Sequence, residues 1–456
     1  MISLSALERT RRMDSQFYSC ENLLATKRLD VIGAKPLTEF AIVSDGNHMG
    51  ISENFIEEGG VPYYRGQDVG HFFIEQAHGA ARIDMRTFSS AHMERSRLSK
   101  GDVLLSIVGT IGGLSLVKTD TPAACSCKLA ILRPKGASAE LLAIFLQSRF
   151  GQIQIHRFKR GAVQMGLILE DFDQLKMPGF SAAFGTGVVE TVNSAFQAVI
   201  SAKIAYSNAE ICLLKEIGLH GCNLNEASAN VKSFKNSFGS TGRLDAEYYQ
   251  PKYEDLLKLL RKDGLTIADV APVRSERFQK TPGADFQYLE IGGLRGDGSV
   301  ASETVACDDA PSRASQRVRQ GDIITSTVRP IRRLSALVAA AQDGYVCSSG
   351  FVVLQPKQIA AEVLLVYLRL PAICELMDLH TSASLYPAIS EKDLLGLPIP
   401  KISDDVQRKI STLVQQSFTL KAQSARLLEA AKRAVEIAIE QDEAAGMAYL
   451  SREISI

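Results

Sequence analysis

Residues 101–112 have the sequence GDVLLSIVGTIG, in which a Gly-Asp pair precedes an apolar run and a loop bounded by glycines. This order predicts a buried β-strand that ends in a tight turn. Residues 321–332, GDIITSTVRPIR, repeat the pattern 220 residues later, with an arginine-rich loop in place of the glycine-bounded one. The same strand and turn are therefore predicted twice in the chain.

Further matches extend the repeat on both sides of this strand. Residues 63–66 correspond loosely to residues 288–291, and RMDSQFY at 12–18 corresponds to RLDAEYY at 243–249. Three pairs of equivalent residues lie 222 positions apart: Cys125 and Cys347, Asp171 and Asp393, and Phe196 and Phe418. Because the spacing grows toward the N-terminus, insertions have changed loops around a common framework. The chain is predicted to contain two similar units.

Two long helices are predicted between and after these units. Residues 187–217 carry apolar side chains at helical spacing, and Ser403-Asp404-Asp405 precedes a second such run of about 40 residues. We expect a mixed α/β (α+β) fold, with two similar domains of mixed sheet and short helices joined by two long antiparallel helices in an internal pseudo-two-fold arrangement. The expected segments are domain one at 1–180, the central helix at 181–221, a linker and domain two at 222–400, and the C-terminal helix at 401–456.

The composition is that of a globular protein. The 456 residues are 46% hydrophobic and 22% charged, and this length allows two or three domains. No apolar run reaches the roughly 18 residues of a membrane helix. The first residues lack the apolar core of a signal peptide. We therefore expect a cytoplasmic protein with no membrane association.

Motifs of the common catalytic sites are absent from the sequence. It contains no Gly-rich phosphate loop ending in Lys-Ser/Thr, no methyltransferase motif, and no histidines or cysteines at metal-site spacing. The loop at 109–112 could cradle a phosphate, but a turn between strands is the simpler interpretation. We expect no catalytic residue, no metal site and no cofactor on this chain.

A formal net charge of zero hides local clusters of positive charge. The clusters in the two units contain His156, Arg157, Lys159 and Arg160, then Arg274 and Arg277, and finally Arg329, Arg332 and Arg333. Arginine in loops suits phosphate contacts and bidentate guanine recognition. The alternative is that these side chains are solvated or pair with carboxylates such as Glu170, Asp171 and Asp173.

Several of these segments together resemble the specificity (S) subunit of type I restriction–modification systems. The resemblance rests on RLDAEYY at 243–249, DGNH at 45–48, the two Gly-Asp strands, CSSGF at 347–351, and the segment 390–400 that leads into a long helix. It covers nearly the whole chain. The opening at 12–14 departs from the pattern, and residues 329–332 replace the GTIG loop of the first unit.

The resemblance implies a non-catalytic protein that reads a bipartite site on double-stranded DNA. Its partners would be two methyltransferase subunits, which use S-adenosylmethionine to methylate adenine, and an ATP-driven restriction subunit. The DNA-binding candidates are Asp45, Asn47, His48, Arg65, Gln67, His156, Arg157, Lys159, Arg160, Arg274, Arg277, Arg329, Arg332, Arg333 and Tyr386. The candidates for partner binding on the helices are Phe196, Ile200, Phe418 and Leu427.

Three alternatives remain at this point. The two phenylalanines could simply pack helix on helix. The same architecture could serve another phage-defence or DNA-modification complex. The chain could also be a DNA-modifying enzyme in its own right, although the missing catalytic motifs argue against this.

Overall fold

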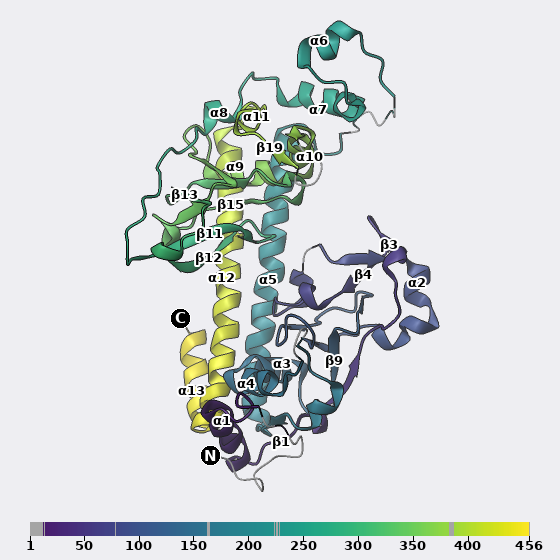
Figure 1. Ribbon diagram of the computed structural model, residues 1–456, viewed down its shortest axis with the longest axis vertical. Helices are drawn as coiled ribbons and strands as arrows, with labels where there is room; N and C mark the ends of the chain where they lie inside the picture. Colours follow the sequence, from purple (N-terminus) through teal and green to yellow (C-terminus); the bar gives the residue numbers. More distant parts are fainter. Residues whose placement is uncertain are drawn as a thin grey trace. The chain divides into compact units, whose positions relative to one another are not determined.

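The computed structural model describes residues 12, 14–77, 79–161, 165–222, 224, 227, 229–382 and 387–455 (Figure 1). Contacts divide the chain into two units. Unit 1 comprises residues 1–200 and 421–456, and unit 2 comprises residues 201–420. The fold is mixed α/β, and each unit contains sheets together with part of both long helices, which confirms the predicted fold class. The domain boundaries at 180, 221 and 400 stay a prediction.

Unit 1 contains two four-stranded sheets, of order β2-β9-β6-β7 and β3-β5-β4-β8. Its elements are α1 (Cys20–Val31), β1 (Lys35–Pro36), β2 (Ala41–Asp45), β3 (Phe55–Ile56), β4 (Val61–Tyr64), β5 (Ala81–Ile83), α2 (Met85–Ser89), β6 (Val103–Ser106), β7 (Leu114–Leu116), β8 (Ala124–Cys125), β9 (Leu129–Pro134), α3 (Ala139–Gln147), α4 (Arg149–Phe158), β10 (Lys176–Met177) and the start of α5 (Ala182–Glu216). Every residue of β6 is buried, and α3 packs on this strand and its neighbours.

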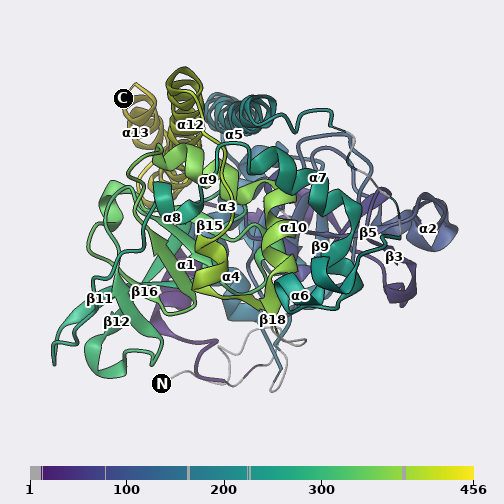
Figure 2. The same cartoon turned by 90° about the horizontal axis from the view of Figure 1, so that it is seen from above.

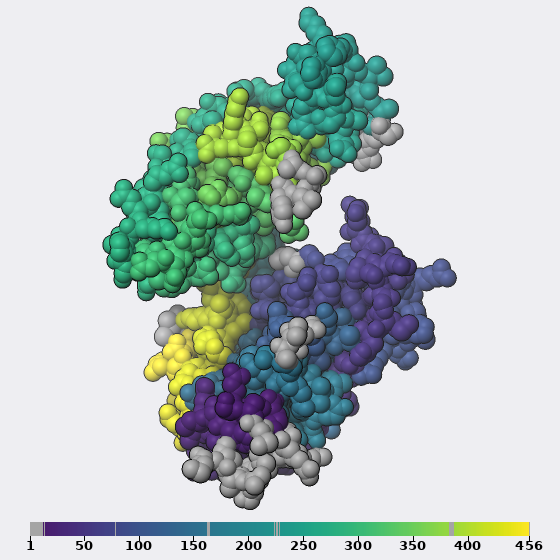
Figure 3. Space-filling model, in the orientation of Figure 1, coloured from purple at the N-terminus to yellow at the C-terminus, as the bar shows by residue number. Residues whose placement is uncertain are grey.

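Unit 2 contains a three-stranded sheet, β15-β14-β17, and a four-stranded sheet, β12-β11-β16-β13. Its elements are α6 (Phe238–Thr241), α7 (Pro251–Leu260), α8 (Ile267–Val270), β11 (Asp285–Leu294), β12 (Val300–Ala306), β13 (Ala314–Arg317), β14 (Ile323–Ser326), β15 (Ser335–Leu337), β16 (Val346–Ser348), β17 (Phe351–Leu354), α9 (Ala361–Arg369), α10 (Pro371–Leu379), β18 (Thr381–Ser382), β19 (Ala388–Ile389), α11 (Glu391–Leu395) and the start of α12 (Asp404–Glu440). Within this unit, the segment around α6 stands out from the sheets (Figure 3).

The registers of the two units match residue by residue at the repeated strand. In unit 1, Val103 of β6 pairs with Leu132 of β9, and in unit 2 the equivalent Ile323 of β14 pairs with Leu354 of β17. The second sheets also agree. The parallel pairing of Tyr63–Tyr64 with Ala124–Cys125 recurs as that of Tyr288–Leu289 with Val346–Cys347. The correspondence between residues 63–66 and 288–291, although loose in sequence, is therefore structural.

The Gly-Asp pair forms the same turn in both units. Gly101 and Gly321 have φ values of +91° and +83°, a region that favours glycine. The buried carboxylate of Asp102 accepts a hydrogen bond from the Ser99 amide (2.9 Å). Asp322 accepts one from the Arg319 amide in the same way (2.8 Å). The carboxylate therefore closes the turn that delivers the chain into the central strand.

The two long helices pack antiparallel within each unit, and they lie side by side in both ribbon views (Figure 2). In unit 1, the first part of α5, with Val188 and Val192, shares a core with Ala431 and Val435 near the end of α12. In unit 2 the pairing is reversed, since the last part of α5 shares a core with the first part of α12. Among the described residues, no helix combines the length and hydropathy that crossing a membrane requires.

The C-terminal helical segment is divided in two, a break that the helical spacing did not predict. Arg28 of α1 donates to the carbonyls of Ile439 (2.6 Å) and Glu440 (2.8 Å), which have no helical partner at the end of α12. Asp442 then accepts a hydrogen bond from the Ala445 amide (2.8 Å) and begins α13 (Glu443–Ile454).

Phe196 is a core residue rather than a solvent-facing one. Its ring is 8% exposed and lies 5.0 Å from the ring of Phe73, centroid to centroid, so it fastens α5 to the β-rich part of unit 1. We predict that Phe196→Ala lowers the free energy of unfolding by about 3–5 kcal/mol, measured by urea denaturation. The control is Ile204→Ala on the same helix, whose side chain is 56% exposed and should change stability by no more than about 0.5 kcal/mol. A fully stable Phe196→Ala variant would contradict the packing role.

Candidate nucleic-acid interface

In unit 1, the loop that follows β6 lies against helix α4. The Gln152 side chain donates to the Gly112 carbonyl (3.2 Å), and a Cβ at position 112 would lie 2.6 Å from the Gln152 side-chain oxygen. Thr110 donates its hydroxyl to the Gly66 carbonyl (2.8 Å). These hydrogen bonds are made within the protein, so the loop is better interpreted as a turn than as a phosphate-binding loop.

The chain leaving α4 is joined to the same loop by backbone bonds. Arg160 and Gly166 exchange two hydrogen bonds (2.9 and 2.8 Å), and the Leu167 amide donates to the Ile107 carbonyl (2.9 Å). The end of α4 and the loop after β6 are therefore one surface feature. We call it the loop–helix junction of unit 1, comprising residues 107–112 and 152–161.

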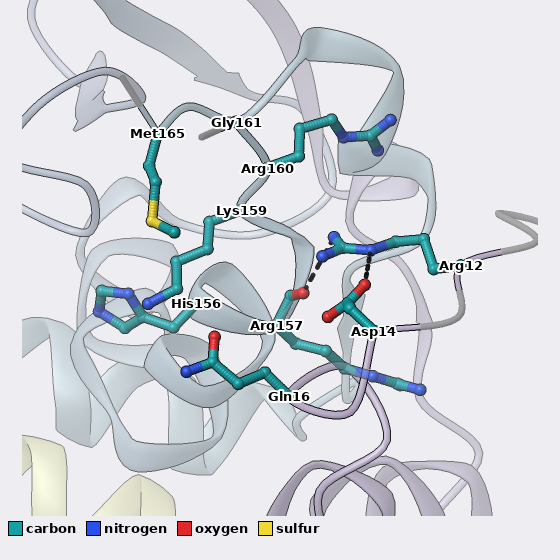
Figure 4. A pocket seen from close by; sticks show the side chains of 9 residues that line it. All are labelled: Arg12, Asp14, Gln16, His156, Arg157, Lys159, Arg160, Gly161 and Met165. Carbon is teal, nitrogen blue, oxygen red and sulfur yellow. Dashed lines mark hydrogen bonds and ion pairs between the residues drawn. The ribbon is translucent and has the colours of Figure 1, made fainter. Parts of the chain in front are cut away.

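A pocket of about 390 Å³ opens beside this junction (Figure 4). Its lining is Arg12, Asp14, Gln16, His156, Arg157, Lys159, Arg160, Gly161 and Met165. Lys159 and Arg160 bring charge to its wall, and Arg160 also forms an ion pair with Asp171. Partial burial, with a smaller contribution from Lys159, lowers the pKa of His156, which favours the neutral imidazole. The lining carries more cationic side chains than carboxylates.

Arg157 has a different role from its neighbours. It is only 4% exposed, and its guanidinium donates to the Phe17 carbonyl (2.9 Å) and to the Thr26 hydroxyl (2.9 Å). Figure 4 shows the side chain pointing away from Lys159 and Arg160. Its position suits anchoring of the preceding segment better than contact with a ligand.

Both units carry the same arginine anchor next to a short helix, α4 in unit 1 and α10 in unit 2. Arg12 donates to Asp14 (2.8 Å) and to the Arg157 carbonyl (3.3 Å), and its guanidinium lies 4.8 Å from the Phe17 ring centroid. Arg243 makes the equivalent three contacts in unit 2, with Asp245 (2.9 Å), the Leu379 carbonyl (2.9 Å) and the Tyr248 ring (4.4 Å). The opening at 12–14, which departs from the family pattern in sequence, keeps the contacts.

In unit 2, the loop–helix junction comprises residues 327–333 and 374–382, where the 3₁₀ turn Pro330–Arg332 packs on α10. The Ile389 amide donates to the Thr327 carbonyl (2.9 Å), as Leu167 does to Ile107 in unit 1. Arg332 is exposed, whereas Arg333 forms an ion pair with Glu210 of α5. Arg329 and Arg333 have φ values of +52° and +60°, the non-glycine residues with positive φ among those described.

The DGNH turn at 45–48 lies at the end of β2. Asp45 is buried and binds His48 (2.7 Å), and it forms an ion pair with Arg95. The buried Asn47 amide donates to the Met49 carbonyl (2.9 Å). His48 alone of the three predicted residues here is exposed, with 62% of its side chain accessible. Asp45 and Asn47 therefore hold the turn that presents His48.

The remaining DNA-binding candidates are spread over both units. Arg65 pairs with Asp68 (3.3 Å), while Gln67 beside it is exposed. Arg274 makes two hydrogen bonds to the buried Asp322 (2.6 and 2.9 Å), so it supports the Gly-Asp turn, while Arg277 is exposed. Tyr386 lies outside the described residues. The exposed candidates are thus His48, Gln67, His156, Arg160, Arg277 and Arg332.

The partner-binding candidates on the helices are mostly packed inside. Phe196 and Leu427 are buried in the core of unit 1, Ile200 is half-buried against it, and Phe418 is half-buried against the core of unit 2. The sequence pattern also missed three carboxylates: Asp14 and Asp245, which pair with Arg12 and Arg243, and Glu210, which pairs with Arg333. The repeated spacing of Arg12 to Asp14 and of Arg243 to Asp245 was the available signal for the first two.

Comparisons with known proteins add the following. No protein-family model and no curated protein match the chain. Among solved structures it is similar to a type I restriction–modification S subunit from M. genitalium, at 12% identity and a TM-score of 0.39, over 89% of this chain and 94% of that one. The HsdS subunit from Thermoanaerobacter tengcongensis matches at 14% identity and a TM-score of 0.30, over 90% and 96%.

A third structure, described as the structural basis of complex assembly and conformational transition of the type I R-M system, matches at 16% identity and a TM-score of 0.30, over 90% and 97%. These are structures of the family that the sequence motifs resemble. The described residues also contain no cluster of His, Cys, Asp or Glu suited to a metal ion.

The arginine anchors make a testable contribution to stability. The hydrogen bond from Arg243 lowers the pKa of Asp245, so the anchor stabilises the fold above the unfolded pKa of about 3.9 and is lost as pH falls through the folded value. We expect Asp245→Asn to cost about 0.2–1 kcal/mol at pH 7, and the difference from wild type to shrink below pH 4. Asp14→Asn, its equivalent in unit 1, should behave alike in urea titrations at several pH values. A difference that grows on acidification would contradict the anchor.

Proposed function

We propose that this chain is a DNA-recognition subunit, in which each unit reads one half of a bipartite site on double-stranded DNA. The observation that carries the proposal is the duplication of one framework with different loops. The registers of the central strands, the Gly-Asp turns and the arginine anchors agree between units, while the loops at 109–112 and 329–333 do not. A constant scaffold with variable loops suits two readers of different sequences.

The partners that we propose follow from the family resemblance. Two methyltransferase subunits would bring S-adenosylmethionine and methylate adenine, and a restriction subunit would bring ATP-driven cleavage.

On the helices, Phe196 and Leu427 are buried in the core of unit 1. Ile204 and Ile211, two turns apart on α5 and 56% and 40% exposed, are better placed for docking a partner. In the cell we propose a cytoplasmic complex.

The independence of the two readers can be tested by domain exchange. We predict that replacing residues 1–180 with the first domain of another S subunit changes one half of the recognised site and leaves the other half unchanged. Methylated adenines mapped after reconstitution with the methyltransferase subunits would give the result. The reciprocal exchange of residues 222–400 is the matched control and should change the other half. A change of both halves in either chimera would contradict the proposal.

The absence of chemistry on this chain is a separate prediction. The purified chain should bind duplex DNA but neither methylate it with S-adenosylmethionine nor cleave it with Mg²⁺ and ATP, because the sequence contains no motif for either reaction. Radiolabelled methyl transfer and gel-based cleavage assays would measure this. Turnover that co-purifies with the chain through every chromatographic step would identify it as an enzyme.

A further inference from the structure

The loop–helix junctions of the two units are equivalent places in the fold. In each, the loop after the central strand (β6 or β14) packs on a short helix (α4 or α10). The chain that follows this helix then forms backbone hydrogen bonds with the start of the loop. The bridge between Val108 and Gly166 in unit 1 recurs between Val328 and Ala388 in unit 2. The two surfaces can therefore be compared position by position.

Both junctions carry a cluster of arginine or lysine, but the two clusters lie on opposite segments, and the helix end in unit 2 carries the carboxylates Glu375 and Asp378 instead. In unit 1 the loop 109–112 is uncharged, and Lys159 and Arg160 follow the helix. In unit 2 the positions equivalent to these two residues are Thr381 and Ser382, and the charge sits in the loop, at 329–333. Its retention at one place, from different residues, points to a ligand common to both units.

The backbone of the unit 2 loop supports this interpretation. Arg329 adopts a left-handed conformation at the position equivalent to Gly109, whose φ is +82°. A non-glycine residue in this region is strained, and such strain concentrates at functional sites. Glycine at this position would remove the strain and also the cation. The chain has an arginine there despite the strain, as expected where the positive charge binds a ligand.

We propose that the two loop–helix junctions are the phosphate-binding surfaces of the DNA interface, through Lys159 and Arg160 in unit 1 and through Arg332 with its loop in unit 2. This proposal rests on the proposed function and specifies where each unit contacts the phosphate backbone of DNA. Arg157 and Arg333 are positioning residues, since the first anchors residues 17 and 26 and the second binds Glu210. Phosphate contacts of this kind supply affinity without sequence information.

The experiment measures binding of the full chain to a fluorescein-labelled, mixed-sequence DNA duplex by anisotropy over a range of salt concentrations. Lys159→Ala and Arg332→Ala should each reduce the slope of log K against log salt by about 0.9, equivalent to roughly eightfold weaker binding at 0.1 M salt. The double variant should show the sum, because the sites lie in different units. Lys100→Ala and Lys357→Ala are the matched controls. Both are exposed lysines at the opposite ends of the same sheets and should leave the slope unchanged.

A charge transplant separates position from residue identity. Ser382 is exposed and occupies the place of Arg160, so Ser382→Lys in the Arg332→Ala background should restore the lost slope. Thermal melts of each variant would establish that the fold is kept. The proposal would be overturned if the slope did not change in Lys159→Ala and Arg332→Ala, if the control variants lost as much slope, or if the transplant had no effect. None of these results would contradict DNA recognition by the chain. A wild-type chain without salt-dependent duplex binding would overturn both.

Discussion

Each unit depends on a buried aspartate that closes the turn before its central strand. Asp102 and Asp322 accept a backbone hydrogen bond three residues upstream, and each is held by an arginine, Arg133 (3.4 Å) or Arg274 (2.6 Å). A buried carboxylate left without these partners would carry a large desolvation cost. The turn therefore fixes where the strand enters the sheet, and one residue of slip would exchange the side chains that pack on the two sides of the sheet.

The arginine anchors extend this framework to the segment that precedes the sheets of each unit. Arg12 and Arg243 each contact a carboxylate, an aromatic ring and a backbone carbonyl in the last turn of a helix. The helix end is then fixed in relation to the loop beside it. This matters for function because the surfaces that we propose to contact phosphate lie at the same helix end.

The comparison between units separates what is structural from what is variable. Hydrogen-bonded turns, strand registers and anchors are shared, whereas charged side chains have moved between segments of the loop–helix junction. A rigid scaffold tolerates such exchange because an exposed arginine or lysine side chain is solvated and contributes little to the packing of the fold. The DNA recognition that we propose can therefore change in one unit without loss of the fold.

The sequence by itself determined the duplication, the strand at 101–112 and its repeat, the two long helices and the mixed α/β class, because these follow from local periodicity and repeated spacing. It also located the basic clusters, but not which members face solvent. Only the tertiary structure decided that Arg157, Arg274 and Arg333 point into internal contacts, that Arg160 pairs with Asp171 at the surface, and that Arg332 is exposed. The carbonyls at the end of α12 likewise accept hydrogen bonds from Arg28, some 410 residues away, and no local pattern records these bonds. Long-range pairing of charged side chains is set by how the chain folds back on itself, and for that reason residue type alone could not reveal it.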